Sequence, residues 1–252
     1  MFDIHNHVLP GLDDGATDLS ESLRMLTAAA RQGITHVGCT PHGNDRINEK
    51  TDLLYQSVFL QVKEAAKREG IPVELALALE LMLGVDILQT LHLPLATYHG
   101  AGKYFLIEFP WHTPFEILLN AIRACMQSEM IPIIAHYERY EQAIKKPEQP
   151  HKVRHAGAVI TMDAGSLVGQ FGAAMTRRSR QLLNWGCVDV LASDAHDDME
   201  HGFCLRQGFE AAAAIIGEAE AQKLVSDNPR RIWEGTPWPR AEEEKEEETR
   251  TT

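Results

Sequence analysis

Seven short apolar runs recur along this chain at intervals that suit a repeated strand and helix unit, and six of them carry a histidine or a carboxylate as the last or next-to-last residue. The six are FDIHNH, THVGCTPH, VELALALE, YFLIEF, IPIIAH and VDVLASDAH, and the seventh is AVITMDAG. Consecutive strand ends lie roughly 27 to 38 residues apart, about the length of a strand–helix–strand crossover. We therefore predict an α/β fold whose seven parallel strands close into a barrel. An open doubly wound sheet remains an alternative, because periodicity does not distinguish the two.

Helix signals lie between these runs. The first predicted helix is opened by Asp18 and closed by Gly33, and the second runs roughly over residues 48–69. After YFLIEF, Thr113 and Glu116 have the spacing of a capping box, with the intervening proline at the first helical position. The alternation of strands and helices supports the predicted barrel.

Length and charge limit the classes of protein. The chain of 252 residues is long enough for one large core, and we expect a single domain over residues 1–236 and a disordered acidic tail over 237–252, which contains AEEEKEEETRTT. The net charge of −12 argues against nucleic acid as the main partner. The chain lacks an apolar stretch of about 20 residues and a signal peptide, so we expect no membrane insertion and a cytoplasmic location.

Two short motifs at the ends of the first and last runs indicate a metal site. His5 and His7 lie two apart on a strand, so both imidazoles point to the same face and can reach one ion. Asp194 and His196 repeat this arrangement at the end of the last run. In a closed barrel the first and last strands are neighbours, so the two pairs would meet.

Three further residues strengthen this interpretation. Glu80, Glu108 and His136 each end a run of apolar residues, where a charged group is costly unless it is paired or bound to a metal. Two positions are weaker when taken singly: the histidine of CTPH, and Asp14, with which Asp13 competes as a ligand. The full set of nine candidate ligands is His5, His7, Asp14, His42, Glu80, Glu108, His136, Asp194 and His196. Oxygen and nitrogen donors without a thiolate suit a cluster of hard or borderline divalent cations.

With these residues in place, the chain resembles the polymerase and histidinol phosphatase (PHP) superfamily, and within it the manganese-dependent bacterial protein-tyrosine phosphatases of capsule and exopolysaccharide synthesis. The resemblance extends to about Trp233. It is carried by DIHNHVLPGLDDGATDLSES, CTPH, the run ending in Glu80, LIEFP, IAHYERY, SDAH and DNPRRI. It implies a distorted seven-stranded TIM-like β/α barrel, the PHP fold, with a trinuclear metal centre.

The family's ligands can be carried over residue by residue. The resemblance implies His5, His7, Glu80 and Asp194 for one ion, Glu80, Glu108 and His136 for a second, and Asp14, His42 and His196 for a third. Manganese is the expected metal, although iron, zinc and cobalt also suit these donors. Such ions lower the pKa of water from about 15.7 to about 7, which would provide a hydroxide to attack phosphorus.

Arg139, Asp194 and His42 are the predicted catalytic residues. Arg139, in HYERY, is the best candidate for a bidentate phosphate clamp. Its alternative role is a surface ion pair with Glu138 or Glu141. No residue is an obvious general acid for protonation of the leaving group.

The chain departs from the family pattern in one place. Relatives often carry Arg-Pro-Pro shortly after Asp-x-His, whereas this chain has His201 followed by Gly202 and Phe203. His201 and Arg206 therefore join Arg139 as candidate substrate-binding residues, although Arg206 also fits a solvated helix position.

Other chemistries are disfavoured. No cysteine is followed six positions later by an arginine, so the thiol-based tyrosine phosphatase loop is absent. The four widely spaced cysteines are expected to be small buried residues. We therefore predict a metal-dependent phosphatase that acts on a phosphotyrosine protein, a bacterial tyrosine kinase, and regulates polysaccharide export. The alternatives are a small-molecule phosphatase of the histidinol phosphate type, a phosphodiesterase or nuclease, and a metal-binding regulatory module that has lost activity.

Overall fold

All seven predicted runs form strands in a computed structural model that describes residues 1–43, 47–84 and 90–239. The strands are β1 (Phe2–Asn6), β2 (His36–Cys39), β3 (His42–Gly43), β4 (Glu74–Leu77), β5 (Glu80–Met82), β6 (Tyr104–Glu108), β7 (Ile131–Ile134), β8 (Val159–Asp163) and β9 (Val190–Ala192). Two runs are each interrupted once, so THVGCTPH gives β2 and β3, and VELALALE gives β4 and β5. Pro41 interrupts the first of them because proline has no N–H to donate to a ladder.

The strands close into a parallel barrel. Hydrogen bonds bridge both interruptions, since the amide of Ala78 donates to the carbonyl of Cys39 and that of Glu80 to Pro41. The two sheets, ordered β1-β2-β4 and β3-β5-β6-β7-β8-β9, are therefore one continuous ladder. At the seam, Asn6 pairs with Ala195 in parallel. The first and last strands are thus neighbours, as predicted, and the open sheet is wrong.

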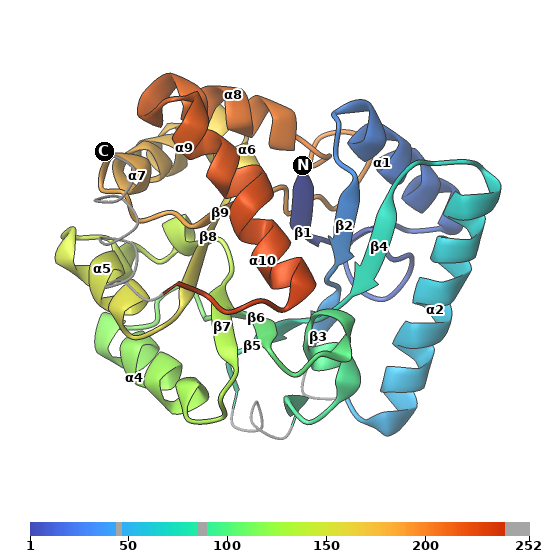
Figure 1. The fold of residues 1–252 in the computed structure, drawn as a ribbon, viewed down its shortest axis with the longest axis horizontal. Coiled ribbons are helices and arrows are strands. Elements are labelled where there is room, and N and C mark those ends of the chain that lie inside the picture. Colours follow the sequence, from blue (N-terminus) through green and yellow to red (C-terminus); the bar gives the residue numbers. More distant parts are fainter. Residues whose placement is uncertain (44–46, 85–89, 240–252) are drawn as a thin grey trace.

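Helices surround the strands (Figure 1). They are α1 (Leu19–Arg31), α2 (Glu49–Arg68), α4 (Phe115–Met126), α5 (Glu148–His155), α6 (Ala164–Val168), α7 (Gly172–Asn184), α8 (Leu205–Ile216), α9 (Glu218–Gln222) and α10 (Asn228–Glu234). Short 3₁₀ turns are η1 (Pro94–Ala96), η2 (Tyr98–Gly100), η3 (Tyr137–Arg139) and η4 (Glu141–Ala143), and η5 (Lys223–Asp227) is a π turn. None of the helices in these ranges is long and apolar enough to cross a membrane.

The predicted helix starts are confirmed in two cases and wrong in one. The side chain of Asp18 accepts a hydrogen bond from the amide of Glu21 and caps α1, and Asn48 caps α2. The capping box at Thr113 does not form, because Pro114 rather than Thr113 is the N-cap, and the Thr113 hydroxyl donates to the carbonyl of Pro110, 2.7 Å away. Helix α4 therefore begins at Phe115 without a side-chain cap.

The strands separate two layers of apolar side chains. On β6, Phe105 packs with the helices, whereas Tyr104 and Leu106 belong to a second cluster formed largely by side chains from the barrel strands. Residues two apart on a strand share a face, so Glu108 continues the row of Tyr104 and Leu106. This alternation directs the polar side chains at the strand ends into the mouth of the barrel.

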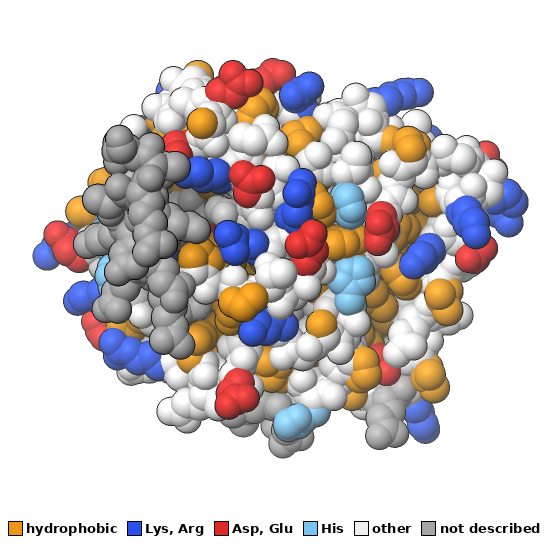
Figure 2. All heavy atoms as spheres, viewed as in Figure 1, with side chains coloured by type: hydrophobic (Ala, Val, Ile, Leu, Met, Phe, Trp, Pro, Cys, Tyr) orange, Lys and Arg blue, Asp and Glu red, His pale blue; other side chains and the backbone are white. Residues whose placement is uncertain are grey.

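The remaining features concern cysteines, surface and tail. All four cysteines are free and buried, as predicted. Acidic and basic side chains are interspersed on the face shown in Figure 2. Trp238 packs edge-on against Tyr104, with ring centroids 6.5 Å apart. From residue 240 onward, the predicted acidic tail lies outside the described residues.

Candidate metal centre

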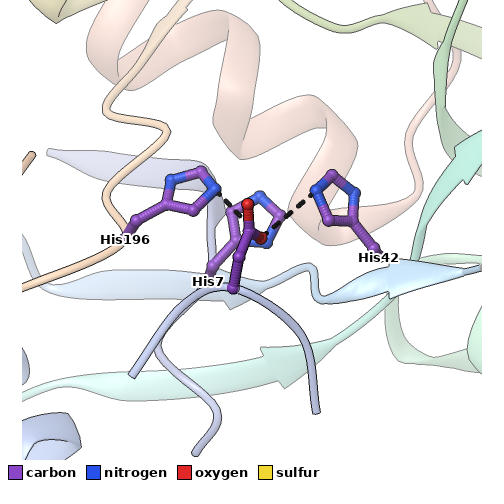
Figure 3. Close-up of side chains that lie close together, drawn as sticks. His7, His42 and His196 are labelled. Carbon is purple, nitrogen blue, oxygen red and sulfur yellow. Dashed lines mark ion pairs between the residues drawn. The ribbon is translucent and has the colours of Figure 1, made fainter. Parts of the chain in front are cut away.

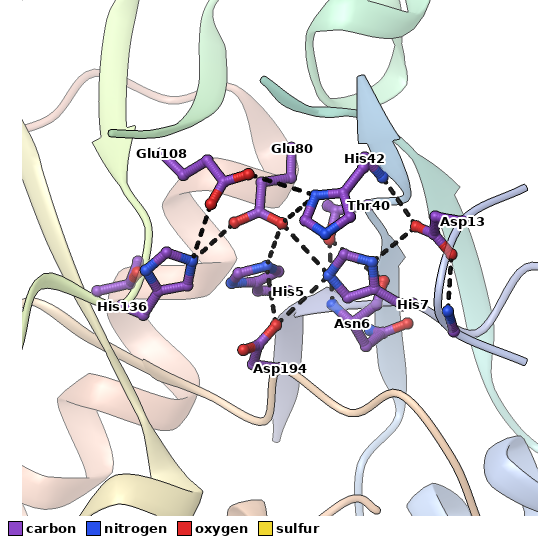
Figure 4. Close-up of polar contacts among 12 residues, drawn as sticks. His5, Asn6, His7, Asp13, Thr40, His42, Glu80, Glu108, His136 and Asp194 are labelled. Atoms are coloured by element: carbon purple, nitrogen blue, oxygen red, sulfur yellow. Dashed lines mark hydrogen bonds and ion pairs between the residues drawn. The ribbon is translucent and has the colours of Figure 1, made fainter. Parts of the chain in front are cut away.

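Four buried side chains from distant parts of the chain converge at the seam of the barrel (Figure 4). The Nε2 atom of His5 lies 3.3 Å from Glu80 Oε2 and 3.2 Å from Asp194 Oδ1, and Nε2 of His7 lies 3.3 and 3.4 Å from the same two oxygens. Each side chain is at most 2% exposed. These four residues, called the buried quartet below, are the set expected for the first ion.

The second predicted set adjoins the buried quartet through Glu80. The other carboxylate oxygen of Glu80, Oε1, lies 3.0 Å from Nε2 of His136, and Glu108 Oε2 lies 3.6 Å from the same nitrogen. His42 also reaches this group, because its Nδ1 lies 3.0 Å from Glu80 and 3.4 Å from Glu108. The two carboxylate oxygens of Glu80 thus face the first and the second predicted sets, although Glu80 begins β5 rather than ending a strand.

The third predicted set is more open. Asp14 Oδ1 lies 3.5 Å from Nε2 of His42 and 3.5 Å from Nε2 of His196. Figure 3 shows this arrangement, with His7 between the other two imidazoles. The ring nitrogen Nδ1 of His196 is 2.8 Å from the backbone carbonyl of Asp194, so it carries the proton and leaves Nε2 as the ligand atom. Asp14, His42 and His196 are called the open trio below.

Asp13 does not join the ligand cluster but orients it. One carboxylate oxygen of Asp13 accepts hydrogen bonds from Nδ1 of His7 at 2.7 Å and from the amide of His42 at 2.8 Å. The other accepts from the amide of Gly15, whose backbone approaches His7 so closely that a Cβ would lie 2.0 Å from the His7 carbonyl. Such a carboxylate fixes the tautomer of a metal-binding histidine. The sequence offered Asp13 only as a competing ligand.

Backbone strain marks two of the nine positions. His136 has φ of 33° and Asp194 has φ of 52°, in the left-handed region that non-glycine residues seldom adopt. Such strain is frequent at functional sites. Tyr140 lies behind His136, with its hydroxyl 3.4 Å from Nδ1, and accepts a hydrogen bond from the amide of Phe109. The strained turn therefore directs Nε2 of His136 toward the carboxylates.

The electrostatics of the buried quartet suit a cation. Burial opposes ionisation of Glu80, but His5 and hydrogen bonds from His136 and His42 hold its pKa well below the ordinary value. Burial lowers the pKa of His5, but Glu80 and Asp194 raise it to about 9. The carboxylates thus stabilise positive charge at this point. In addition, the buried Nε2 atoms of His5 and His7 have no hydrogen-bond partner within the described residues, as expected of atoms that bind a metal ion.

Arg139 lies against the buried quartet. Its Nη2 donates to Asp194 Oδ2 at 2.6 Å and to Asp163 Oδ2 at 2.7 Å. The proposed alternative, a surface pair with Glu138 or Glu141, is wrong, because Glu138 is fully buried and Glu141 pairs with Arg178. Within the described residues, Nε and Nη1 of Arg139 make no hydrogen bond, so these donors remain available to an anion.

The two other candidate substrate-binding residues differ in position. The ring of His201 stacks on His196, with centroids 4.5 Å apart, and its buried Nε2 has no hydrogen-bond partner in the described structure. It also lies close enough to Asp194 and His196 to share a cation with them. Arg206 is half exposed on α8 and contacts Gln32 and Glu210, which are not among the candidate ligands.

The arrangement therefore brings all nine predicted ligands into one cluster beside an arginine. Such clusters bind several divalent cations, which activate water and neutralise phosphoryl oxygens. Sequence reasoning missed Tyr140 and Asp163 and considered Asp13 only as a competing ligand, whereas each of the three holds a predicted residue in position. Their signals are local, since all three lie beside or within motifs such as LDDG, HYERY and MDAG.

Comparison with known proteins agrees with this geometry. The family model for capsular polysaccharide synthesis proteins CpsB/CapC matches residues 1–234. The tyrosine-protein phosphatase YwqE of Bacillus subtilis is 32% identical over 90% of this chain and 89% of its own length. The tyrosine-protein phosphatase CpsB of Streptococcus pneumoniae is 27% identical over 92% of this chain and 98% of its own.

Solved structures give the same result. A chain from the crystal structures of YwqE and CpsB, described as unique metal-dependent tyrosine phosphatases, superposes with a TM-score of 0.87 at 28% identity, covering 95% of this chain and 97% of that one. The lactonase Lmo2620 of Listeria monocytogenes shares the fold alone, with a TM-score of 0.54 at 12% identity over 92% of this chain and 94% of its own. These matches confirm the resemblance found in the motifs. The chain therefore belongs to the CpsB/CapC family of capsular polysaccharide synthesis.

Proposed function

We propose that this chain is a metal-dependent tyrosine-protein phosphatase with three divalent ions, manganese in the cell. The observation that carries the proposal is the buried quartet, in which Nε2 of His5 and of His7 face two carboxylates without a hydrogen-bond partner in the described part of the chain. Burying two carboxylates is unfavourable unless cationic groups compensate them. The donor set, made of imidazoles and carboxylates, suits manganese but also iron, zinc and cobalt.

Each ion has a set of ligands in this proposal, and Glu80 is shared by the first two sets. The buried quartet holds the first, Glu80, Glu108 and His136 hold the second, and the open trio holds the third. When bound, such ions lower the pKa of water to about 7 and neutralise the oxygens of a phosphoryl group. Asp13 and Tyr140 keep the imidazoles of His7 and His136 in the orientation that binding requires.

Arg139 supplies the positive charge that comes from the protein itself. Asp163 and Asp194 hold one of its terminal nitrogens, and this fixes the plane of the guanidinium. Its remaining donors are Nε and Nη1, and one of them would then donate to an oxygen of the substrate's phosphoryl group. His42 and Asp194 would act in catalysis by holding ions, and His201, which stacks on His196, would contact the substrate beside the centre. We assign no role in catalysis to Arg206.

The proposed substrate is a phosphotyrosine in a bacterial tyrosine kinase that controls capsule or exopolysaccharide synthesis. Support comes from the similarity to YwqE and CpsB along nearly the whole chain and from the family's link to capsular polysaccharide synthesis. Four free buried cysteines suit the reducing cytoplasm, where we place the reaction.

A substrate panel tests this function. The manganese-loaded protein should hydrolyse a phosphotyrosyl peptide with a higher kcat/KM than histidinol phosphate or a nucleotide diester, and a chelator should abolish turnover. The Arg139→Ala variant is the reference for lost activity. Preference for histidinol phosphate or the diester would reject the proposed substrate, and a wild type no faster than the variant on any of the three would favour a regulatory module without catalysis.

A further inference from the structure

Phe171 lies between the metal centre and the surface. It precedes α7, and 37% of it is exposed. The guanidinium carbon of Arg139 lies 5.3 Å from the centroid of its ring, and the ring of His201 meets it edge-on at 5.1 Å. Both neighbours contact candidate metal ligands: Arg139 donates a hydrogen bond to Asp194, and His201 stacks on His196. Phe171 is therefore one side chain removed from the candidate metal ligands and still reaches solvent.

The ring of Phe171 packs closely against Gly165 and Arg139. A Cβ on Gly165 would lie 3.0 Å from Cε2 of Phe171, so the ring packs against backbone that carries no side chain. The guanidinium of Arg139 adds a cation–π contact. These contacts restrict the position of the ring, so its exposed part is a fixed apolar surface beside a site whose other groups are polar or charged.

We propose that Phe171 forms the wall against which the phenyl ring of the substrate packs, and that it selects aryl over alkyl phosphates. This inference rests on the proposed function. A phosphoryl group bound to Arg139 and the ions places the atoms attached to its bridging oxygen near the rim, where Phe171 is the aromatic neighbour of Arg139. Aromatic pairs are stabilised beyond their buried area, whereas the side chain of phosphoserine is short and has no ring to contribute.

Binding of two analogues that cannot be hydrolysed separates the wall from the phosphate grip. Calorimetry on the full-length, manganese-loaded protein would compare phenylphosphonate with methylphosphonate. We expect the wild type to bind the phenyl compound about three- to tenfold more tightly. Phe171→Ala should lose most of this ratio without weakening methylphosphonate, and Phe171→Tyr should keep it. Phe171→Leu preserves the bulk without the ring and should fall between them.

A matched control is available on α2, which contributes no residue to the proposed wall. Leu60 is 55% exposed and lines an apolar hollow of about 310 Å³ with Phe59 and Leu75, and Figure 2 shows apolar side chains gathered beside α2. Leu60→Ala should leave both affinities unchanged.

The outcomes distinguish the wall from the function on which it rests. Equal weakening of both analogues in Phe171→Ala would mean that the ring only orders Arg139, and this would overturn the inference. A wild type that binds both analogues equally would also overturn it while leaving the phosphatase intact. A wild type that binds neither analogue would contradict the proposed function, and the inference would fall with it.

Discussion

The buried quartet and the open trio use the same kinds of donor in different surroundings. In the quartet, no side chain is more than 2% exposed. In the trio, Asp14 is 70% exposed, His42 36% and His196 16%. The closest donor pairs are also tighter in the quartet, at 3.2 to 3.4 Å against 3.5 Å.

This difference in exposure determines how strongly the buried quartet and the open trio depend on a bound cation. Carboxylates deep in the barrel mouth are screened little by solvent, so their charge must be compensated by a cation or a proton. Asp14 is hydrated whether or not an ion is present. We therefore expect the ion of the quartet to be retained and the ion of the trio to exchange with solution, so that loss of a trio ligand is restored by excess metal.

Glu80→Gln should cause the largest loss of activity, because Glu80 contacts ligands of both the buried quartet and the open trio. Loss of one carboxylate charge would weaken the binding of the first two ions together and lower kcat/KM by about 10³-fold, as loss of a key electrostatic group can do. Turnover of a phosphotyrosyl peptide and metal content by elemental analysis would measure this. The control is Glu74→Gln, an exposed glutamate on β4 whose ion pair is with His36, outside the metal centre. Activity close to wild type in Glu80→Gln would refute its bridging role.

Arg139→Lys should come next, with a loss of about 100-fold in kcat/KM. Lysine keeps the charge but cannot contact Asp163, Asp194 and a phosphoryl group in one plane. The inhibition constant of inorganic phosphate should rise while the metal content stays near that of the wild type. If the metal content falls as far as in Glu80→Gln, Arg139 stabilises the quartet rather than the substrate.

Asp14→Ala tests the open trio. We expect one ion to bind about 10- to 100-fold more weakly, the effect of removing groups around a metal, with the other two retained. Activity should recover when manganese is raised, and titration of activity against manganese would measure the shift. A loss that no concentration of metal restores would show that the trio is as demanding as the quartet.

Asp13→Asn should have the smallest effect, about tenfold on metal affinity. The amide side chain introduced by this substitution would keep a hydrogen bond to the backbone N–H of His42 but lose the charge that orients His7. The measurement is metal affinity by calorimetry, with Asp52→Asn on α2 as the control. An unchanged affinity would mean that the backbone alone holds His7.

Local patterns in the sequence were enough to predict the strands and the candidate ligands. The strand ends and the nine donors were recognisable because a charged residue at the end of an apolar run is unusual and its position along the chain is local information. The convergence of His5 and Asp194 required only that the barrel close. The helix starts at Asp18 and Asn48 follow from local capping chemistry.

Features that depend on tertiary contacts were not predictable. The partners of Arg139 lie 24 and 55 residues away, and the burial of Glu138, which accepts a hydrogen bond from Ser166, has no local signature. Thr113 has the right spacing for a capping box, but its hydroxyl donates to the carbonyl of Pro110 in the preceding turn. The interruption of the strands at Pro41 is visible in the sequence, whereas the hydrogen bonds that continue the ladder across it are not.

The buried quartet is the proposed binding site of a catalytic cation. Anomalous diffraction at the manganese edge, from crystals of active protein grown with manganese, tests it most directly. We predict a peak about 2.0 to 2.3 Å from Nε2 of both His5 and His7, between Glu80 and Asp194. Protein that turns over a phosphotyrosyl peptide while its crystals show no metal at that point would contradict a catalytic role for the buried quartet.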